Sequence, residues 1–133
     1  MSDKVVIGWR EKITLPDWGV RLRAKVDTSA RTSSLDVRNL RVEDGIAIFE
    51  IPVGYRTQNF MEIRAPVICE KSVNKGAGEI QDRIIIPVKV VIRSREKVIE
   101  LTLASPRTIS HRLLLGRRAL EGDFLVVVDQ DPA

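Results

Sequence analysis

Histidine and cysteine are almost absent from this chain, which contains one of each among its 133 residues. A single cysteine excludes an intrachain disulfide, and because Cys69 lies in a strand-like segment we interpret it as a buried structural thiol. With one histidine and no His-Glu-x-x-His sequence, the chain lacks the ligands of a catalytic zinc site and the triad of a serine protease. We therefore predict no metal, and we interpret His111 as a surface or hydrogen-bonding residue.

Aromatic residues, long apolar runs and phosphate-binding loops are also scarce or missing. Aromatic side chains make up 5% of the sequence, too few for a platform that stacks nucleic-acid bases. No apolar run approaches the roughly 20 residues needed to cross a bilayer, and the N-terminal segment MSDKVVIGWREK does not resemble a leader. No glycine-rich loop ends in Lys-Ser or Lys-Thr, so no nucleotide or other cofactor is predicted. We expect a cytoplasmic protein that has no membrane partner.

Positive charge is in mild excess, with 22 Lys and Arg against 18 Asp and Glu and a net charge of +4. Arginine supplies most of it, and a guanidinium group binds carboxylates and phosphates through two parallel hydrogen bonds. Composition alone therefore favours an acidic partner and leaves an acidic peptide and a nucleic acid as alternatives.

The chain alternates between strand-like segments and turn-forming residues. In residues 19–27 (GVRLRAKVD) every second side chain is apolar, which predicts a half-buried strand. We predict an all-β fold, a closed or partly open β-barrel in a single domain spanning residues 1–133. Pro66 and Pro87 are expected at strand edges or bulges, because proline cannot donate to a ladder. One short C-terminal helix is predicted over residues 117–121, and the other strands over residues 34–42, 46–53, 60–70, 83–94, 97–105 and 124–129.

An aspartate, small residues and hydroxyls crowd the end of the first alternating strand, in residues 26–35 (VDTSARTSSL). Alone, such a sequence is more often a structural Asx-type turn than a site. Near the other end of the chain, residues 113–120 (LLLGRRAL) predict an apolar strand that stops at a glycine and continues into the helix. The two segments together favour a functional interpretation.

These segments resemble the catalytic Asp-Thr-Gly-Ala turn and the hydrophobic-hydrophobic-Gly-Arg segment of retropepsins, in the same order along the chain. In that fold the apolar strand lies beside the catalytic turn and supports it. The chain is more closely similar to a bacterial retropepsin-like family that is labelled ATP-dependent zinc proteases and linked to RimK-type glutamate ligases. The similarity rests on residues 7–11 with 15–16, on residues 24–35, and on residues 114–120 with 124–126, whereas residues 40–82 match loosely.

The resemblance implies an aspartic peptidase whose catalytic residues are Asp27, Thr28 and Ser29. The chemistry needs two carboxylates that share one proton, so that one deprotonates a water while the other polarises the scissile carbonyl. Because the chain supplies one such motif, we expect a twofold symmetric homodimer in which two Asp27 side chains meet. By resemblance, Thr28 hydrogen-bonds across the axis and Ala30 leaves space for a peptide backbone. The family usually has glycine, which permits backbone angles that a Cβ forbids, at the position of Ser29.

Arg31 is the predicted selector of the substrate, because it stands where viral retropepsins carry an acid and this family a basic residue. A guanidinium beside the aspartates pairs with a substrate carboxylate, and the family association implies a glutamate-rich or polyglutamylated tail and a RimK-type ligase as partner. The alternative for Arg31 is a solvated surface residue or a phosphate contact. Residues 71–82 are a candidate flap over the cleft, and Arg117 is expected to brace the fold. The predicted substrate-binding residues are Ala30, Arg31, Thr32, Ser33 and Arg83.

Two other functions remain open at this point. The main alternative is a binding module of the same fold, in which Ser29 has removed catalysis and which holds acidic peptides or the ligase. The other is a small basic β-barrel that binds RNA, which the low aromatic content disfavours.

Overall fold

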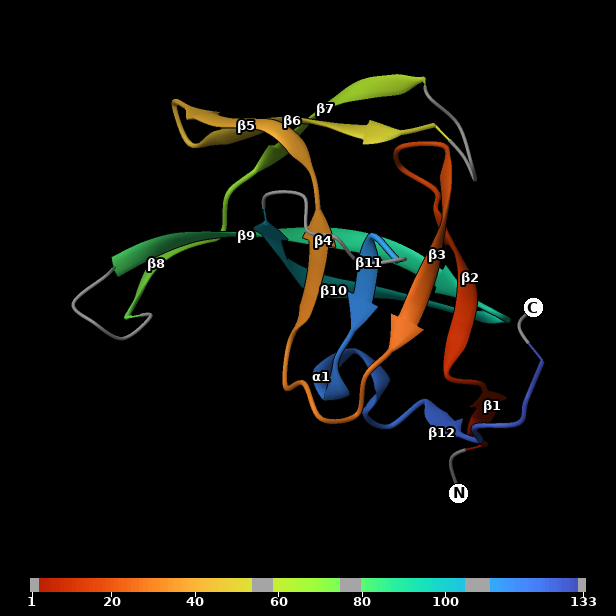
Figure 1. The fold of residues 1–133 in the computed structure, drawn as a ribbon. Helices are drawn as coiled ribbons and strands as arrows, with labels where there is room; N and C mark the ends of the chain where they lie inside the picture. The colour runs from red at the N-terminus through yellow and green to blue at the C-terminus, as the bar shows by residue number, and fades with distance from the viewer. Residues whose placement is uncertain (1–2, 54–58, 75–79, 105–110, 132–133) are drawn as a thin grey trace.

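The computed structural model describes residues 3–53, 59–74, 80–104 and 111–131, with the backbone alone between positions 69 and 82. Within these ranges the chain is almost entirely β (Figure 1), and no helix in them is long and apolar enough to cross a membrane. The elements are β1 (Val5–Ile7), β2 (Arg10–Leu15), β3 (Val20–Val26), β4 (Ser33–Asp36), β5 (Arg38–Glu43), β6 (Ile46–Pro52), β7 (Phe60–Pro66), β8 (Cys69–Asn74), β9 (Ile80–Ile92), β10 (Arg95–Ala104), β11 (Leu113–Leu115), α1 (Arg117–Leu120) and β12 (Phe124–Val126).

Six strands close into a barrel, in the order β10-β4-β11-β3-β2-β9. The long strands β9 and β10 complete the ring by pairing antiparallel, from Ile84 opposite Leu103 to Ile92 opposite Arg95. β8 adds to the outside of this ring by pairing with the first residues of β9. The predicted all-β barrel with one short C-terminal helix is therefore confirmed, and ring closure leaves these six strands paired on both sides for at least part of their length.

The barrel interior is filled because apolar side chains occupy alternate positions along the strands. Burial alternates at every residue of β3, and each fully buried Leu or Ile contributes about 1.5–3 kcal/mol. Glu11 and Asp36 are charged residues that are nevertheless buried. The Glu11 carboxylate, on β2, accepts hydrogen bonds from Arg93 Nε at 2.6 Å and Nη2 at 3.2 Å. The largest fully buried side chains are Phe49, Ile7, Ile13, Leu15, Leu35, Ile48, Ile51, Ile86, Ile92, Leu101, Leu113 and Leu115.

A separate three-stranded sheet, formed by β5, β6 and β7, lies at the end of the barrel away from α1 (Figure 1). Asp44 and Gly45, both with positive φ, make the tight turn between β5 and β6. Phe49 of β6 contacts Trp18 of the β2–β3 turn, with ring centroids 5.7 Å apart, so the sheet packs on the barrel.

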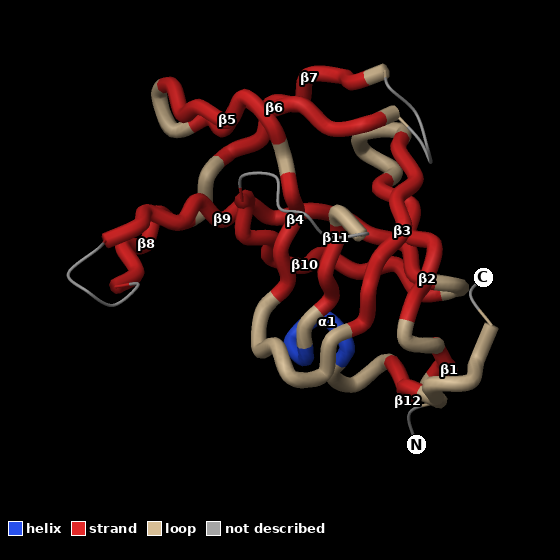
Figure 2. Tube along the Cα trace, in the orientation of Figure 1, coloured by secondary structure: helices blue, strands red, loops and turns tan. Residues whose placement is uncertain are grey.

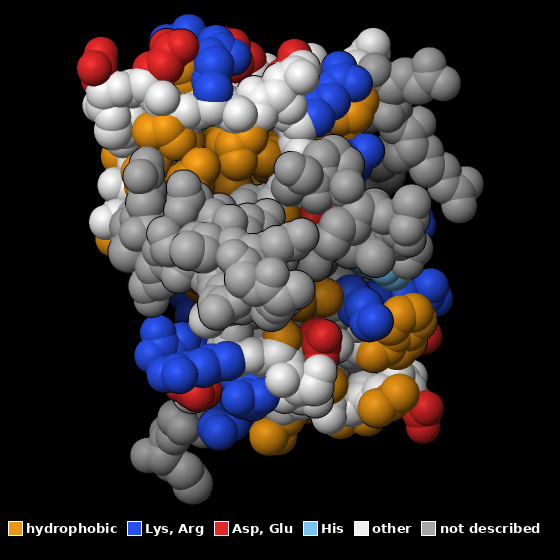
Figure 3. Space-filling view, turned by 60° about the vertical axis from the view of Figure 1, so that its left-hand side comes forward, with side chains coloured by type: hydrophobic (Ala, Val, Ile, Leu, Met, Phe, Trp, Pro, Cys, Tyr) orange, Lys and Arg blue, Asp and Glu red, His pale blue; other side chains and the backbone are white. Residues whose placement is uncertain are grey.

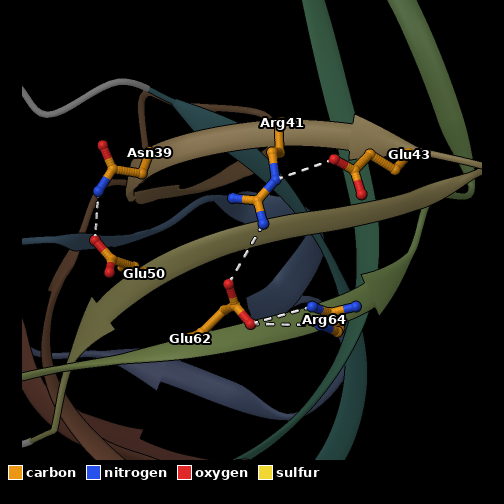
Figure 4. Close-up of polar contacts among 6 residues, drawn as sticks. All are labelled: Asn39, Arg41, Glu43, Glu50, Glu62 and Arg64. Atoms are coloured by element: carbon orange, nitrogen blue, oxygen red, sulfur yellow. Dashed lines mark hydrogen bonds and ion pairs between the residues drawn. The ribbon is translucent and has the colours of Figure 1, made fainter.

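The exposed face of this sheet carries a set of charged contacts (Figure 4). Arg41 pairs with Glu43 at 3.3 Å and with Glu62 at 3.5 Å, and Arg64 pairs with Glu62 at 3.4 Å. Such solvated ion pairs contribute about 0–1 kcal/mol each. They balance the charge of this face locally, so it offers no excess of either sign.

Two strands that the sequence predicts as continuous are each divided. The segment 34–42 becomes β4 in the barrel and β5 in the smaller sheet, with the division at Val37. Within β5 the register against β6 then shifts between Arg38 and Arg41, where Asn39 takes a positive φ of 54°. The segment 60–70 likewise becomes β7 and β8. Both divisions move the chain between sheets, which a period-two pattern does not report.

The two prolines lie where strand pairing is one-sided. Pro66 is the last residue of β7, an edge strand of the three-stranded sheet. Pro87 lies within β9, opposite Glu100 of β10. On the other side of β9 the pairing with β8 reaches only Ile85, and that with β2 involves residues 91–92. The missing N–H of Pro87 therefore interrupts neither of these two ladders.

The first and last strands, β1 and β12, pair in parallel beside the end of β3 (Figure 1). The Val26 N–H donates to the Trp9 carbonyl at 2.7 Å, which joins the loop after β1 to the end of β3. Gly8 lies against the C-terminal segment so closely that a Cβ would come within 2.3 Å of the Gln130 carbonyl oxygen. The loop after β1 therefore lies next to the end of β3, which leads into the turn that contains Asp27.

Candidate functional site

The turn after β3 is positioned by β11, which lies between β3 and β4. Leu115 is opposite Val26 in a parallel pairing, and Leu113 is opposite Leu35 in an antiparallel one. The Asp27 N–H continues this ladder by donating to the Leu115 carbonyl at 2.9 Å. Figure 2 shows the turn as a loop beside α1. The two segments that resemble the retropepsin motifs are thus adjacent, with the apolar strand beside the turn.

The Asp27 carboxylate is partly exposed and is held by its own turn. Its Oδ1 accepts hydrogen bonds from the Ser29 hydroxyl at 2.5 Å and from the Ser29 N–H at 3.0 Å. The backbone carbonyl of Asp27 accepts a further one from the Ala30 N–H at 3.2 Å. These Ser29 hydrogen bonds, followed by the charge of Lys25, lower the pKa of Asp27 from its usual 3.8. In the single chain the carboxylate is therefore ionised at neutral pH.

Ser29 occupies the usual glycine position without adopting a backbone conformation that requires glycine. Among the described residues, positive φ values outside glycine occur at Asn39, Asp44 and Arg93, so Ser29 is not in the left-handed region. Its side chain points back to Asp27 and replaces a solvent contact of the carboxylate with a fixed donor.

The helix α1 holds the turn in place through backbone and side-chain hydrogen-bond donors. Arg117 donates through Nη1 to the carbonyls of Thr28 at 3.0 Å and Ser29 at 3.1 Å. Its backbone N–H donates to the Ala30 carbonyl at 2.8 Å, and the Arg118 N–H donates to the Arg31 carbonyl at 3.1 Å. Four consecutive carbonyls of the turn therefore have a donor in α1, which restricts where the Asp27 side chain can lie.

Gly116 and Ser33 form the contact that brings α1 this close. The Gly116 N–H donates to the Ser33 hydroxyl oxygen at 3.0 Å, and Ser33 is 3% exposed. A Cβ on Gly116 would lie 2.3 Å from the Thr32 carbonyl oxygen. Ser33 was predicted to bind substrate; in this conformation its hydroxyl lies inside the protein and is used to position the turn.

Three of the other residues predicted to bind substrate follow Asp27 on the turn. Ala30 is partly exposed, and Arg31 and Thr32 are exposed on the segment that follows Asp27. Thr32 and Ser33 both line a pocket of about 220 Å³, together with Arg118 and others. The pocket adjoins the turn and carries a cation that sequence analysis did not single out, Arg118, although it directly follows the predicted bracing residue.

Arg83 makes no contact with this turn among the interactions of the described residues. It is exposed on β9, where its backbone pairs with Lys71 of β8. The structure makes β8 and β9 a hairpin, and positions 75–79, the centre of the predicted flap, lie outside the described residues. In the described ranges, no group of three or more His, Cys, Asp or Glu side chains is arranged to hold a metal ion.

Comparisons with known proteins agree with this geometry. Residues 6–132 match the family described as "RimB-like: Retropepsin-like aspartic endopeptidase RimB". A "Probable alpha-L-glutamate ligase" of Parasynechococcus marenigrum (strain WH8102) is 32% identical over 132 residues, and one of Shewanella halifaxensis (strain HAW-EB4) is 31% identical over 133 residues. Both alignments cover 95% of this chain but 28% and 29% of the ligases, so the chain spans less than a third of their length.

A solved structure shows the same fold. The crystal structure of Lpg0085 from Legionella pneumophila, a protein of unknown function, superposes with a TM-score of 0.80, 21% sequence identity and coverage of 98% of each chain. The family match extends over both sequence motifs and over the segment between them, and it confirms the family predicted from those motifs. The chain belongs to the RimB-like family of retropepsin-like aspartic endopeptidases.

Proposed function

We propose that this chain is one subunit of a homodimeric aspartic peptidase, in which the Asp27 carboxylates of two subunits share one proton. The observation that carries the proposal is the partly exposed Asp27 carboxylate, which β11 and α1 hold at the end of β3 in a chain of this family. Each subunit contributes one domain, residues 1–133, and one carboxylate. The second carboxylate comes from the partner through an isologous contact.

Apolar side chains near the turn support the dimer. The β1–β12 pair lies beside the Asp27 turn, and its surroundings expose large apolar residues to solvent. Their exposed fractions range from 37% to 68%, which is unusual for a cluster of neighbouring valine, leucine and tryptophan side chains. A twofold axis next to this cluster would bury it and bring two turns together. The residues are Val6, Trp9, Leu125, Val127 and Val128.

The chemistry follows from placing two such carboxylates within hydrogen-bond reach. Each Asp27 is ionised in the single chain, but two like charges this close cannot both remain ionised, so the pair takes up one proton. The ionised carboxylate removes a proton from a water, whose oxygen attacks the scissile carbonyl carbon while the protonated carboxyl donates to the carbonyl oxygen. The C–N bond then breaks as the amine leaving group takes up a proton. Thr28, exposed on the turn, would meet its counterpart across the axis.

The proposed substrate is an acidic peptide, with glutamate-rich tails as the leading class. Arg31 is exposed four residues after Asp27, where its guanidinium can pair with a substrate carboxylate. In the relatives named glutamate ligases, a segment similar to this chain makes up 28–29% of the length. This supports a glutamate ligase as a partner in the cytoplasm. A glutamate ligase and a peptidase for glutamate-rich chains would act on the same class of bond in opposite directions.

The proposal is tested by Asp27→Asn, with Asp17→Asn in the exposed β2–β3 turn as the matched control. Cleavage of a glutamate-rich peptide is followed by mass spectrometry. The Asp27 variant should lose activity at least about 100-fold, because general acid–base catalysis contributes 10²–10⁴-fold, and the control should retain it. Equal cleavage by both variants would rule out the mechanism.

The second candidate function is a binding module of the same fold that does not cut. The short hydrogen bond from Ser29 to Asp27 favours it, because a donor on the ionised carboxylate opposes the uptake of the shared proton. Saturable binding of an acidic peptide that is recovered intact after long incubation with the wild-type dimer would support this module over the peptidase.

A further inference from the structure

The outward faces of β2 and β3 form a surface of uniform charge. Alternation along both strands points every second side chain out of the barrel, and five of these six outward residues are basic. The sixth is Thr14, and no Asp or Glu takes an outward position on either strand. The five residues, here called the basic strip, are Arg10, Lys12, Arg21, Arg23 and Lys25.

The strand register sets these like charges opposite one another. Arg10 is directly across from Lys25, and Lys12 is directly across from Arg23. Like charges at opposed positions of an antiparallel pair destabilise the pair, so the sheet alone gives no reason for this arrangement. The exposed face of β5–β7 differs, because there each described arginine lies beside a glutamate (Figure 4). An anion bound along the basic strip would relieve the repulsion.

The strip borders a pocket of about 250 Å³ that is lined by Arg10, Glu11, Lys12, Arg23 and His111. Its one acid, Glu11, accepts two hydrogen bonds from Arg93, so its charge is balanced by a cation outside the strip. Burial, and then the charges of Arg10, Lys25 and Arg23, lower the pKa of His111. In the space-filling view, Lys and Arg side chains gather beside the single histidine (Figure 3). The pocket is thus a site of positive potential with room for a carboxylate side chain.

The strip leads into the Asp27 turn. Lys25 precedes Asp27 by two residues, and its charge lowers the pKa of both Asp27 and His111, so it lies within electrostatic reach of the pocket and of the turn. Arg10 begins β2 directly after Trp9, whose carbonyl accepts the Val26 N–H. A ligand along the strip would therefore end beside the carboxylate.

We propose that the basic strip is the docking surface for an extended acidic polypeptide, which it directs towards Asp27 of the same subunit. This inference rests on the proposed function and adds the residues that select the substrate class. Alternate side chains of an extended peptide repeat every 6.4–6.8 Å, as do the outward cations of a strand, so successive carboxylates can face successive cations. Nucleic acid is the less suitable occupant, because the Trp9 ring, which could stack on a base beside the strip, already contacts His111 and Arg10.

The test measures binding separately from cleavage. Full-length protein carrying Asp27→Asn is titrated with a fluorescent peptide of ten glutamates, and binding is followed by anisotropy at low and at physiological salt. Adding Lys12→Gln and Arg23→Gln should weaken binding about tenfold and flatten its salt dependence, because two exposed ion pairs are lost. The matched control, Arg41→Gln with Arg64→Gln, removes the same charge from the β5–β7 sheet and should change the dissociation constant less than about twofold.

Thermal unfolding separates loss of docking from loss of folding. The strip variant replaces two exposed side chains and removes repulsion between opposed cations, so it should remain fully folded at the temperature of the binding assay. Equal weakening of binding by the strip and control variants would overturn the proposal, because net charge alone would then explain it. Tighter binding of a ten-phosphate oligonucleotide than of the peptide would also overturn it, in favour of nucleic acid.

The two hypotheses fail in different ways. If the peptide binds through the basic strip but wild-type protein never cleaves it, the peptidase hypothesis is rejected and the docking hypothesis stands. The Lys12→Gln and Arg23→Gln substitutions are also made in a chain that keeps Asp27. If this variant cleaves the ten-glutamate peptide with an unchanged kcat/KM, the docking hypothesis is rejected and the peptidase hypothesis stands.

Discussion

Gly116→Ala is the substitution for which the structure gives the clearest energetic expectation. The new Cβ would lie 2.3 Å from the Thr32 carbonyl oxygen, 2.6 Å from its carbonyl carbon and 2.8 Å from its nitrogen. Ordinary contact begins near 3.4 Å, so the two segments must separate by about 1.1 Å. The obstacle is backbone on both sides, and no side-chain rotation relieves it. Separation also stretches the hydrogen bonds that α1 donates to the carbonyls of Ala30 and Arg31.

The expected cost combines overpacking with weakened hydrogen bonds. Overpacking contributes about 1–3 kcal/mol and each of the two weakened backbone hydrogen bonds about 1 kcal/mol, which gives about 3–5 kcal/mol for Gly116→Ala. For a chain of this length the melting temperature should fall by about 10–20 °C. The free energy of unfolding is measured by urea titration followed by circular dichroism, and peptidase activity is measured below the transition.

Gly19→Ala is the matched control, because it strains the backbone without bringing the new Cβ into contact with any other group. Gly19 has a φ of +66°, and a Cβ at this position would have no neighbour within 4 Å, so the strain of a left-handed alanine, about 1 kcal/mol, is the whole effect. Gly116 has a φ of −92°, which alanine adopts freely, so contact is its whole effect. If Gly116→Ala costs no more than Gly19→Ala, the assigned close packing of α1 on the turn is wrong.

Three further predictions concern the turn and the terminal strands. Ser29→Ala should raise the pKa of Asp27 towards 3.8 in an NMR titration, and an unchanged pKa would contradict the hydrogen bond. The variant should be less stable than wild type above pH 3.8, and this difference in the free energy of unfolding should disappear as the pH falls through the lowered pKa of folded wild type. Arg117→Met leaves two turn carbonyls without their donor and should lower the free energy of unfolding, measured in urea, by about 1–2 kcal/mol. An unchanged free energy would mean that water serves these carbonyls as well as the guanidinium does. Val128→Asp should weaken the dimer at least about tenfold in sedimentation velocity, and an unchanged dimer would place the interface elsewhere.

Local patterns made much of the barrel predictable. Alternation from Val20 to Val26 predicts both the strand and the point at which it presents Asp27, because one face must be buried. The glycine after Leu115 predicts where strand gives way to helix, and α1 begins there. The adjacency of the two motifs came from the family resemblance, since neither segment encodes its partner locally.

Other features depend on contacts that no local pattern reports. The direction of the Ser33 hydroxyl is decided by Gly116, a partner 83 positions away. The basic strip is visible only once β2 and β3 are paired, because the register sets Lys12 opposite Arg23. The division of segment 34–42 follows from pairing with two different partners, β10 and β11 for β4 and β6 for β5, which single-sequence alternation cannot show.

The insertion of β11 between β3 and β4 has a consequence for the order in which the protein is made. The strands on either side are complete within the first 36 residues, but Leu113–Leu115, and the donors of α1 that follow, are synthesised only after the strands β5 to β10. Until then the gap beside β3 is open, and the carbonyls of the Asp27 turn have no donor from α1. Such a long-range contact forms slowly and late. The candidate catalytic turn therefore cannot be assembled before β11 and α1 have left the ribosome, and until then the carboxylate has no fixed position.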